Sequence, residues 1–443
     1  MPASAATAPP PGLDPGRLAR ATRRRGRRSA LAVLVLLTAV YAAGIGLPAS
    51  PGSDLRPSEA HVLLSSESWV SDGDPELTDE YAGRAWHGFY DGQLRPAALR
   101  VDGRLVEPDG IGFGLLLAPA YALGGALGAQ LLLAAIAAAG FAIAAALGGR
   151  LVPEPWASGA ALAVGLSPPA VLAATTIAPA MTCATLIAGA ALLALRVRDH
   201  PAGTPAIGAA ALLAPIVWLW PAAIPAAAVV AAALVRWLRR RRRAWTGLVA
   251  IEILLVSLVV YVTVSGRLFG GLTLYAAATA PHAPTGLASV ADAIGRLERL
   301  AAVLIDPQVG ALLYAPVLAL GFTSAWLLRR SRRERLARAF PAASDVEACA
   351  GLLALVCVAT ALGAALLLAT LDGRAPGEPL AVALPCAAAL CAWSLRRFPR
   401  AGAALALVGV VLTVWTLTGA RLAGDAGVSP VRGPLPWSVV DGR

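Results

Sequence analysis

The sequence predicts an all-α polytopic membrane protein with about eleven transmembrane helices and a large first loop on the outer side. Apolar residues make up 58% of the 443-residue chain, charged residues only 14%, and the mean hydropathy is +0.68. Apolar runs of about 18 residues or more recur, and each can cross a hydrocarbon core of about 30 Å. One polar segment, Ala49 to Asp109, interrupts this pattern. This composition excludes a soluble protein.

The apolar runs define one membrane domain, residues 29–420, between two polar tails. Residues 1–28 predict a disordered basic cytoplasmic tail with seven arginines, and residues 421–443 predict an extracytoplasmic tail. A signal peptide is the alternative for the first run, but its apolar core is normally shorter. The expected spans are 29–48, 127–148, 157–174, 178–195, 206–219, 221–235, 244–264, 309–328, 349–371, 379–395 and 401–420.

Arginine positions indicate how these spans are oriented. With the N-terminus inside, 25 of the 37 basic residues, all of them arginine, fall on the cytoplasmic side and 12 fall outside. This asymmetry is the positive-inside pattern, and it places the C-terminus outside. The predicted location is the plasma membrane. Because the arginines flank membrane spans, the net charge of +11 indicates contact with the lipid bilayer and no nucleic-acid partner.

Three proline- or glycine-rich breaks interrupt the apolar runs. Residues 111–125 carry Pro119 and Gly124–Gly125 and predict an interfacial or re-entrant helix on the outer face. Ser167-Pro168-Pro169 predicts a kink, and Trp218 to Pro221 predicts a tight outer turn. Irregular backbone at membrane depth is tolerated where protein covers it or where it lines a wet cavity. The breaks therefore indicate an outward-facing cavity.

The five cysteines all lie inside apolar spans, without CxxC spacing and without a histidine cluster. Small packing residues are the favoured interpretation, and no structural disulfide or zinc site is predicted.

Carboxylates at the two ends of the polar segment are the candidate functional groups. The segment holds twelve carboxylates against five arginines. Glu59 lies just beyond the first span, and Glu107 and Asp109 lie just before the next apolar stretch. If the first two spans pack side by side, these acids come close together. One could accept a proton from an acceptor hydroxyl, and two could hold a divalent cation, Mg or Mn, against a phosphate.

The middle of the segment is predicted to be a folded loop with solvated acids. Its aromatic residues supply apolar surface that needs a partner, and residues 58–70 predict an amphipathic helix. Asp72-Gly73-Asp74 resembles a fragment of a calcium loop that lacks the later ligands. Glycine and proline interleave the acids of this stretch as in a polar turn, so we expect them to be ordinary loop acids: Asp72, Asp74, Glu76, Asp79 and Glu80.

The order of short motifs along the chain resembles a known family. After a basic tail and one span come the motifs Glu59-Ala60-His61, Asp72-Gly73-Asp74, Asp79-Glu80-Tyr81, Arg84-Ala85-Trp86, Phe89-Tyr90, Asp102-Gly103-Arg104, Glu107 to Gly112 and Leu115 to Gly125, then residues 306–316 and 372–380. This pattern, over about residues 29–400, is similar to GT-C-type multi-span membrane glycosyltransferases, including the dolichyl-phosphate-mannose-dependent mannosyltransferase-like proteins of actinobacteria.

The resemblance implies transfer of a sugar from a polyprenyl-phosphate donor on the outer face to a glycan, lipid or protein acceptor. It implies Glu59 as the acidic residue of the first loop that acts as a base or as a metal ligand. From their positions on the outer side we predict His61, Glu107, Asp109 and Arg374 as substrate-binding residues, with Glu59 and Asp109 as the metal ligands. The sequence departs from the family pattern at Ser58, Ala60, Asp109 and Glu378, where an acid, a proline, a histidine and a basic residue are expected.

Arg374 is the first candidate for a lipid phosphate, because it lies in the short outer loop before residue 379. An arginine that only snorkels to the interface is the alternative.

Three hypotheses follow for the function. The loop carboxylates favour a glycosyltransferase. The missing acid beside Glu59 favours a non-catalytic scaffold or accessory protein of envelope assembly. A transporter is the third, and the absence of an inverted repeat or of acid-lined spans counts against it.

Overall fold

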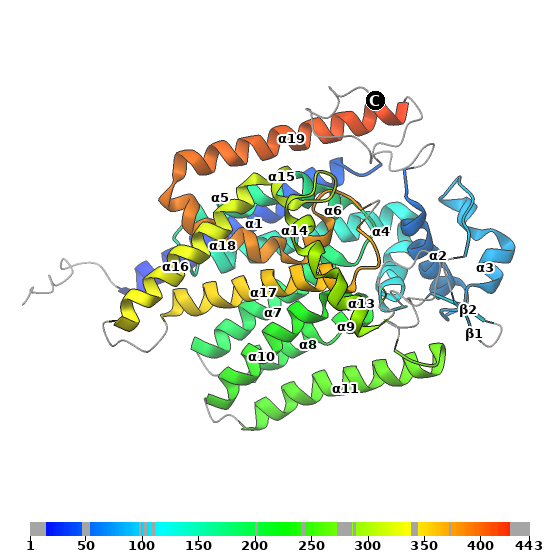
Figure 1. Cartoon of the computed structure of the whole chain (residues 1–443), viewed down its shortest axis with the longest axis horizontal. Helices are drawn as coiled ribbons and strands as arrows, with labels where there is room; N and C mark the ends of the chain where they lie inside the picture. Colours follow the sequence, from blue (N-terminus) through cyan, green and yellow to red (C-terminus); the bar gives the residue numbers. More distant parts are fainter. Residues whose placement is uncertain are drawn as a thin grey trace, which may run out of the picture.

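Long helices run side by side along most of the chain, and a small unit covers one end of them (Figure 1). The computed structural model describes residues 15–46, 54–96, 99–101, 104–107, 111–199, 203–240, 244–272, 286, 289–337, 344–371 and 374–425. Residues 54–107 form the small unit, which we call the loop unit, and the end of the bundle that carries it is called the loop end.

The loop unit contains short helices and one hairpin. Its elements are α2 (Pro57–Ser71), α3 (Thr78–Gly83), the 3-10 helix η1 (Ala85–Gly88) and the antiparallel strands β1 (Leu99–Val101) and β2 (Arg104–Val106). The helix predicted at residues 58–70 is present as α2, but its buried residues lie on several faces, so it does not have the expected amphipathic pattern. It packs on the first part of α4 so closely that a Cβ on Gly114 would lie 2.6 Å from the Ser65 hydroxyl. The loop unit is therefore folded onto the bundle.

The bundle consists of the remaining helices. They are α1 (Pro15–Ala43), α4 (Ile111–Gly148), α5 (Trp156–Gly165), α6 (Pro168–Thr175), α7 (Ala180–Asp199), α8 (Gly203–Leu213), α9 (Ile216–Leu219), η2 (Pro221–Ala223), α10 (Ile224–Arg240), α11 (Ala244–Phe269), α13 (Val290–Gly295), η3 (Arg296–Glu298), α14 (Arg299–Ile305), α15 (Ala311–Tyr314), η4 (Pro316–Leu318), α16 (Ala319–Ala337), α17 (Asp345–Leu367), η5 (Glu378–Ala383), α18 (Leu384–Arg397) and α19 (Pro399–Asp425).

Eight helices among the described residues are long and apolar enough to cross a membrane, or nine if the bent pair α5 and α6 forms one span. The chain is thus a multi-pass membrane protein, and the expected count of eleven spans is not confirmed. If the bent pair is counted as one span, the difference lies in two segments. The segment at 206–219 is divided at Pro215 into α8 and α9. The segment at 309–328 is divided at Pro316, and its long helix, α16, extends into an arginine-rich stretch.

The predicted breaks lie where the sequence placed them. Inside α4, Gly124 and Gly125 leave the helical conformation, and Gly125 has a φ of 57°, which favours glycine. The axes of α5 and α6 differ by 65° across Ser167 and its following prolines. Trp220 is extended between α9 and η2. The breaks at Ser167 and Trp220 thus each lie between two short apolar helices, whereas the break at Gly124–Gly125 lies inside the long α4.

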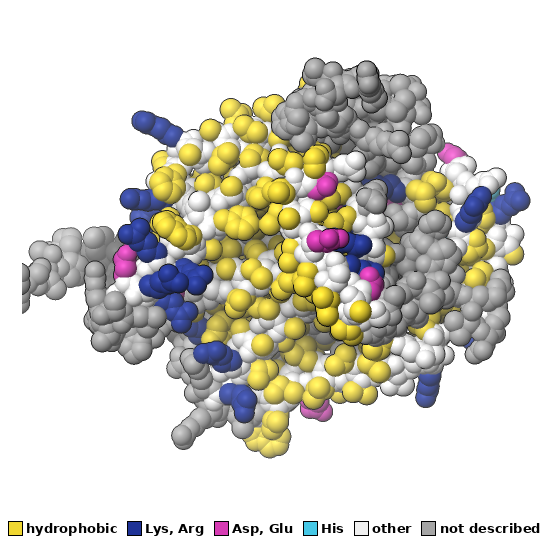
Figure 2. All heavy atoms as spheres, viewed as in Figure 1, with side chains coloured by type: hydrophobic (Ala, Val, Ile, Leu, Met, Phe, Trp, Pro, Cys, Tyr) yellow, Lys and Arg dark blue, Asp and Glu magenta, His cyan; other side chains and the backbone are white. Residues whose placement is uncertain are grey.

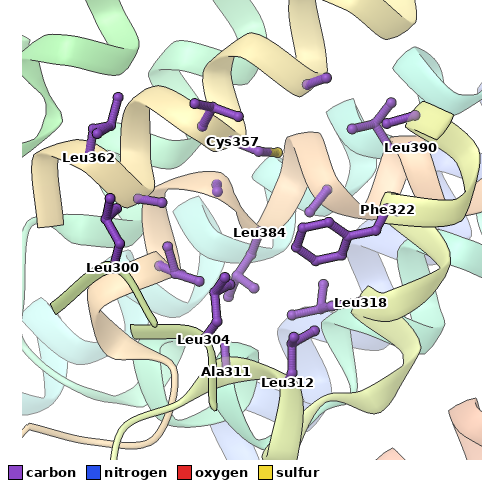
Figure 3. A pocket seen from close by; sticks show the side chains of 18 residues that line it. Leu300, Leu304, Ala311, Leu312, Leu318, Phe322, Cys357, Leu362, Leu384 and Leu390 are labelled. Atoms are coloured by element: carbon purple, nitrogen blue, oxygen red, sulfur yellow. The ribbon is translucent and has the colours of Figure 1, made fainter. Parts of the chain in front are cut away.

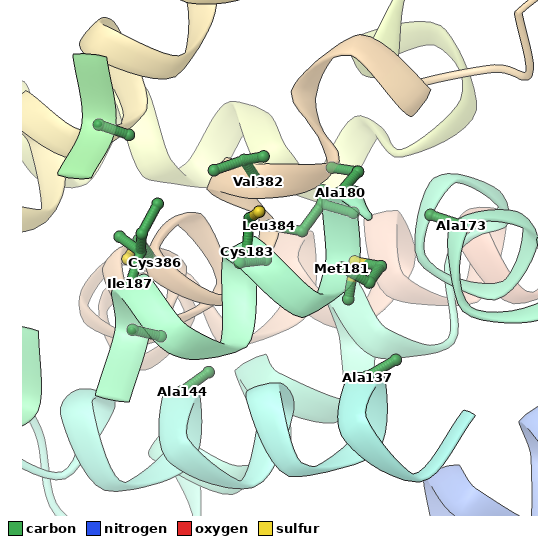
Figure 4. Close-up of a cluster of buried hydrophobic side chains, with 14 of the residues drawn as sticks. Ala137, Ala144, Ala173, Ala180, Met181, Cys183, Ile187, Val382, Leu384 and Cys386 are labelled. Carbon is green, nitrogen blue, oxygen red and sulfur yellow. The ribbon is translucent and has the colours of Figure 1, made fainter. Parts of the chain in front are cut away.

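Small side chains allow the central helices to approach one another closely. Ala137 and Ala144 of α4 face α7, and Val382, Leu384 and Cys386 of η5 and α18 lie on the other side of α7 (Figure 4). Hydrophobic burial does not drive association between helices in lipid, so close packing of small residues is the main attraction. The five cysteines are free, and four of them are buried: Cys183, Cys349, Cys386 and Cys391.

Many arginines that end helices lie at the end of the bundle opposite the loop unit. Figure 2 shows a broad hydrophobic surface over the middle of the molecule and many arginine side chains at the end where α10 and α16 terminate. Arg196 and Arg198 end α7, and Arg396 and Arg397 end α18. A membrane around the hydrophobic zone would place these charges on one side and the loop unit on the other.

A glycine pair in α17 gives a test of this packing. A Cβ on Gly363 would lie 2.5 Å from the backbone oxygen of Ala222, whereas a Cβ on Gly351 would meet nothing within 4 Å. We expect Gly363→Ala to lower stability by about 1–3 kcal/mol, because η2 must shift. Gly351→Ala should cause no loss. Thermal unfolding of the purified protein checks both variants, and equal melting temperatures would contradict this packing.

Candidate active site at the loop end

Glu59 is fixed between the start of α2 and the connection from α6 to α7. Pro57 opens α2, and Glu59 at its third position accepts a hydrogen bond from the Arg56 backbone N–H at 2.8 Å through Oε2. Its other oxygen, Oε1, accepts from the Ile177 backbone N–H at 2.7 Å. The side chain is 3% exposed. A carboxylate oxygen has two lone pairs, so each oxygen keeps acceptor capacity.

The protonation of Glu59 is controlled by opposing effects. Burial raises the pKa of Glu59, because it removes water from the charged carboxylate. The nearby Arg56 guanidinium and the two backbone N–H groups lower it, and the Glu378 carboxylate raises it further. The net result is a pKa above the ordinary value of 4.5. Glu59 is therefore a stronger proton acceptor than a solvated glutamate.

Two arginines and Glu378 form a charged cluster next to Glu59. Glu378, the first residue of η5, accepts from Arg374 Nη1 at 2.9 Å and from Arg56 Nη1 at 3.4 Å. Its Oε2 also accepts from the Ala375 backbone N–H at 2.9 Å. The buried Nε of Arg56 has no hydrogen-bond partner among the described residues. We call Arg56, Arg374 and Glu378 the charged cluster. Within it, the Nε–H of Arg56 is a buried donor that no described residue accepts.

His61 and Glu107 meet inside the loop unit. Nδ1 of His61 lies 2.8 Å from the hydroxyl of Tyr81 and 3.3 Å from Oε1 of Glu107, which follows β2. The Tyr81 ring packs against Trp86 with a centroid separation of 5.8 Å. The side chains of His61 and Glu107 are only 11% and 12% exposed. This group joins α2, α3 and β2, and a carboxylate beside an imidazole is also a possible proton-transfer pair.

The predicted site residues thus separate into two groups. Glu59 and Arg374 belong to one group, because both interact with Glu378. Glu107 belongs to the other group, because it lies beside His61. Residues two apart on a helix do not share a face, so His61 and Glu59 point away from each other. Asp109 lies outside the described residues. Sequence reasoning missed Arg56, and the only local signal for it was the pattern Arg-Pro-x-Glu, typical of a helix start.

An apolar cavity of about 300 Å³ lies among the helices from α14 to α18. Figure 3 shows its lining, in which Leu300 and Leu304 of α14, Leu318 of η4, Phe322 of α16, and Cys357 and Leu362 of α17 surround one space. Phe322 and Val358 are 56% and 57% exposed, so the cavity opens on the side of the bundle. Leu380 also lines it, two residues after Glu378 in η5. A single short helix therefore connects the cavity with the charged cluster.

Two further arginines lie beside this cavity. Arg299, which precedes the lining residue Leu300, donates from Nη1 to the backbone oxygens of Leu368 at 3.2 Å and Ala369 at 3.3 Å. Arg296 donates to the same Leu368 oxygen at 3.0 Å and pairs with Asp292 at 2.9 Å. Both arginines tie the start of α14 to the end of α17. They place two guanidinium groups next to the helix that carries Leu300, and Asp292 compensates the charge of Arg296.

Metal binding by Glu59 and Asp109 stays a prediction, since Asp109 is outside the described residues. Within the described residues, a different set of acids could hold a cation: one ligand oxygen each from Asp72, Asp79 and Glu80 lies within 4.8 Å of the others.

Comparisons with known proteins address the fold. No protein-family model matches the chain, and a search of curated proteins finds no match. Among solved structures, the chain is similar to ArnT from Cupriavidus metallidurans in the apo state, with 15% identity and a TM-score of 0.51 over 90% of this chain and 73% of that one. The chain has a GT-C-like fold. The resemblance inferred from the motifs is therefore confirmed at the level of the fold.

Two further structures are similar. ArnT from the same organism bound to undecaprenyl phosphate matches with 15% identity and a TM-score of 0.50, over the same shares of both chains. The archaeal oligosaccharyltransferase AglB from Archaeoglobus fulgidus, in complex with an inhibitory peptide and a dolichol-phosphate, matches with 12% identity and a TM-score of 0.46, over 90% of this chain and 56% of that one. In this GT-C-like fold, η5 carries both Glu378 of the charged cluster and Leu380 of the cavity wall.

Proposed function

We propose that this protein is a membrane glycosyltransferase that transfers a sugar from a polyprenyl-phosphate donor on the outer face of the plasma membrane. The observation that carries the proposal is the apolar cavity beside the charged cluster, linked by η5. A polyprenyl phosphate has the matching chemistry, an apolar chain with an anionic head. The ArnT structure with undecaprenyl phosphate, which has the same fold, supports the donor class.

The head group should supply most of the selectivity of binding. A polyprenyl chain leaves lipid tails that are as apolar as the cavity, so moving it gains little hydrophobic free energy. A charge-assisted hydrogen bond contributes about 1.5–3 kcal/mol. The buried Nε of Arg56 can donate to a phosphate oxygen without breaking a described hydrogen bond. Arg56 is therefore our first candidate for the phosphate, with Arg374 beside it.

Glu59 is the proposed general base. It would accept the proton of the acceptor hydroxyl as that oxygen forms a bond to the anomeric carbon of the donor sugar. The bond from the anomeric carbon to the phosphate oxygen breaks, and the lipid phosphate leaves with its electron pair. Burial raises the pKa of Glu59, which improves its ability to take the proton. Arg56 and Arg374 would stabilise the charge of the departing phosphate.

A transfer assay tests the proposal. Membranes containing the intact chain are incubated with radiolabelled polyprenyl-phosphate sugars and, in parallel, with the matching nucleotide sugars. We expect label to reach a glycan, lipid or protein acceptor only from the lipid-linked donors. Transfer from nucleotide sugars alone would contradict the proposed donor, and no transfer from a broad set of lipid-linked sugars would contradict the enzyme.

A non-catalytic accessory role is the second candidate, and two observations favour it. Both oxygens of Glu59 already accept backbone hydrogen bonds, as expected of a structural anchor. Glu378 also neutralises part of the positive charge of Arg56 and Arg374, which is the charge that would bind a phosphate. Such a protein would bind the lipid-linked sugar without transferring it. Binding of polyprenyl phosphate in the absence of any transfer would therefore favour this role.

The proposed orientation has its own test. Ser71 is an exposed residue of the loop unit, and Ser331 is an exposed residue in the arginine-rich part of α16. We expect a cysteine at position 71 to react with a membrane-impermeant maleimide added to intact cells, because the positive-inside rule places the loop unit outside. A cysteine at position 331 should react only after the membrane is opened. The reverse pattern would overturn the orientation.

A further inference from the structure

Three acids of the loop unit converge where α2 ends and α3 begins. Asp72 caps the C-terminus of α2, and Asp79 and Glu80 lie in the first turn of α3. One oxygen from each carboxylate lies within 4.8 Å of the other two. Sequence reasoning treated all three as solvated loop acids, but Glu80 is only 5% exposed. Like charges this close repel one another unless a proton or a cation compensates them.

The polar side chains beside the buried Glu80 are another acid, Asp79, and Ser68, whose hydroxyl contacts two backbone oxygens. Neither carboxylate oxygen of Glu80 has a hydrogen-bond partner among the described residues, although both are buried. A buried polar group without a hydrogen bond is costly, and such groups in native proteins often indicate an unseen ion or water. The same carboxylate faces the exposed oxygens of Asp72 and Asp79. The missing partner therefore belongs in the space between the three acids.

The surrounding turn is held in place by other contacts. The Ser68 hydroxyl lies 2.6 Å from the backbone oxygen of Asp74 and 2.9 Å from that of Glu76. The backbone N–H of Leu77 donates to the oxygen of Leu105 at 2.8 Å. These contacts bring α3 against α2, so the acids do not need the ion in order to meet.

We propose that Asp72, Asp79 and Glu80 bind a calcium ion that stabilises the turn between α2 and α3. The ligand set consists only of carboxylate oxygens, which hard divalent cations prefer. Calcium takes six to eight oxygen ligands in a flexible geometry, so three carboxylates and water can bind it. Magnesium demands a nearly ideal octahedron and keeps several of its waters, so it fits a dedicated set of carboxylates less well. Asp72 and Asp79 are exposed, so water can complete the coordination of calcium.

Asp72 and Asp79 are the acidic groups that face Glu80. The site is separate from Glu59 and the charged cluster, so it does not rest on the proposed reaction. Calcium modules outside cells have dissociation constants of about 10⁻⁴–10⁻³ M, and we expect this range.

Equilibrium binding of radioactive calcium to the purified full-length protein tests the site. We expect one ion per chain, with Glu80→Gln and Asp79→Asn each weakening binding by at least about tenfold, or 1.4 kcal/mol. The matched control is Asp91→Asn, which removes an exposed acid of the same loop unit outside the cluster and should leave binding unchanged. Magnesium chloride serves as the competitor, and it should displace calcium only in large excess.

Thermal unfolding separates loss of the site from loss of the fold. In the presence of a chelator, Glu80→Gln should melt no lower than the intact chain, because it removes a buried charge. Calcium should raise the melting temperature of the intact chain but not that of this variant. If Glu80→Gln does not fold, the same two measurements, calcium binding and melting temperature, are made on Asp79→Asn, which changes an exposed residue. Absence of binding at about 10 mM calcium, unchanged binding in both variants, or equal affinity for magnesium would overturn the proposal.

Discussion

Replacing Glu59 with glutamine is expected to lower sugar transfer by about 10²–10⁴-fold, the usual contribution of a general base. Glutamine keeps the shape of the side chain but cannot accept the proton of the acceptor hydroxyl. Lipid binding depends on the cavity and on the charged cluster, so the affinity for polyprenyl phosphate should hardly change. The measurement is initial rates of transfer together with binding of the unlabelled lipid phosphate.

A control is needed because glutamine also disturbs the structure. Its amide nitrogen cannot accept a hydrogen bond, so the N–H group of Arg56 or of Ile177 loses its acceptor, at a cost of about 1–3 kcal/mol. Thermal unfolding detects this effect. Loss of transfer with retained lipid binding and a small fall in melting temperature supports a base. Full transfer activity in a folded Glu59→Gln variant would refute this role and would favour an accessory or binding function.

The pH dependence gives a second view of the same residue. Only the deprotonated carboxylate can act as a base, so transfer should be lost as the pH falls through the pKa of Glu59. Burial raises that pKa above 4.5, so the loss should begin at a higher pH than for a solvated glutamate. The folded state also favours the protonated form. The contribution of Glu59 to stability is therefore fully present below the pKa that Glu59 has in the unfolded chain. It is lost as the pH rises through the higher pKa that Glu59 has in the folded protein.

Filling the cavity is expected to weaken lipid binding strongly. Ala354→Phe places an aromatic ring into the space of about 300 Å³, because Ala354 lines it from α17. We expect the affinity for polyprenyl phosphate to fall at least about tenfold, or 1.4 kcal/mol, since the ring occupies the space that the chain would enter and keeps the head group from its position. Stability should change little, because the ring enters existing space and does not displace packed atoms.

The matched control is the neighbouring residue. Leu355 lies on the same helix and is 57% exposed, but it does not line the cavity, so Leu355→Phe should bind lipid like the intact chain. Saturable binding of a fluorescent polyprenyl phosphate to purified protein measures both variants. Equal affinities for Ala354→Phe and Leu355→Phe would show that the lipid chain occupies another surface.

Most of the fold was predictable because local chemistry determines it. Prolines and glycines gave the breaks at Gly124–Gly125, at Ser167 and at Trp220, since they restrict the backbone whatever surrounds it. The span count was less predictable. Pro215 and Pro316 divide two runs that hydropathy alone reads as continuous, and the arginines of α16 lie within its helix and not after it.

The candidate site was harder to predict, because its members meet only through tertiary packing. The sequence placed Glu59 and Glu107 at the two ends of one loop, but β2 brings Glu107 to His61, on another face of α2. Burial of Glu80 depends on the way α3 folds against α2, which glycine and proline spacing does not reveal. The cavity combines residues of α14 to α18 that lie up to 90 positions apart, from Leu300 to Leu390.

The most direct test of the account is photocrosslinking with a polyprenyl phosphate that carries a diazirine in its chain. The lipid is added to the purified protein in nanodiscs, and labelled peptides are mapped by mass spectrometry. We expect saturable labelling of the peptides that line the cavity, from α14, α17 and η5, and its loss in Ala354→Phe but not in Leu355→Phe. Labelling that is not saturable, or that is confined to lipid-exposed helices such as α11 and α19, would contradict a donor site in this cavity.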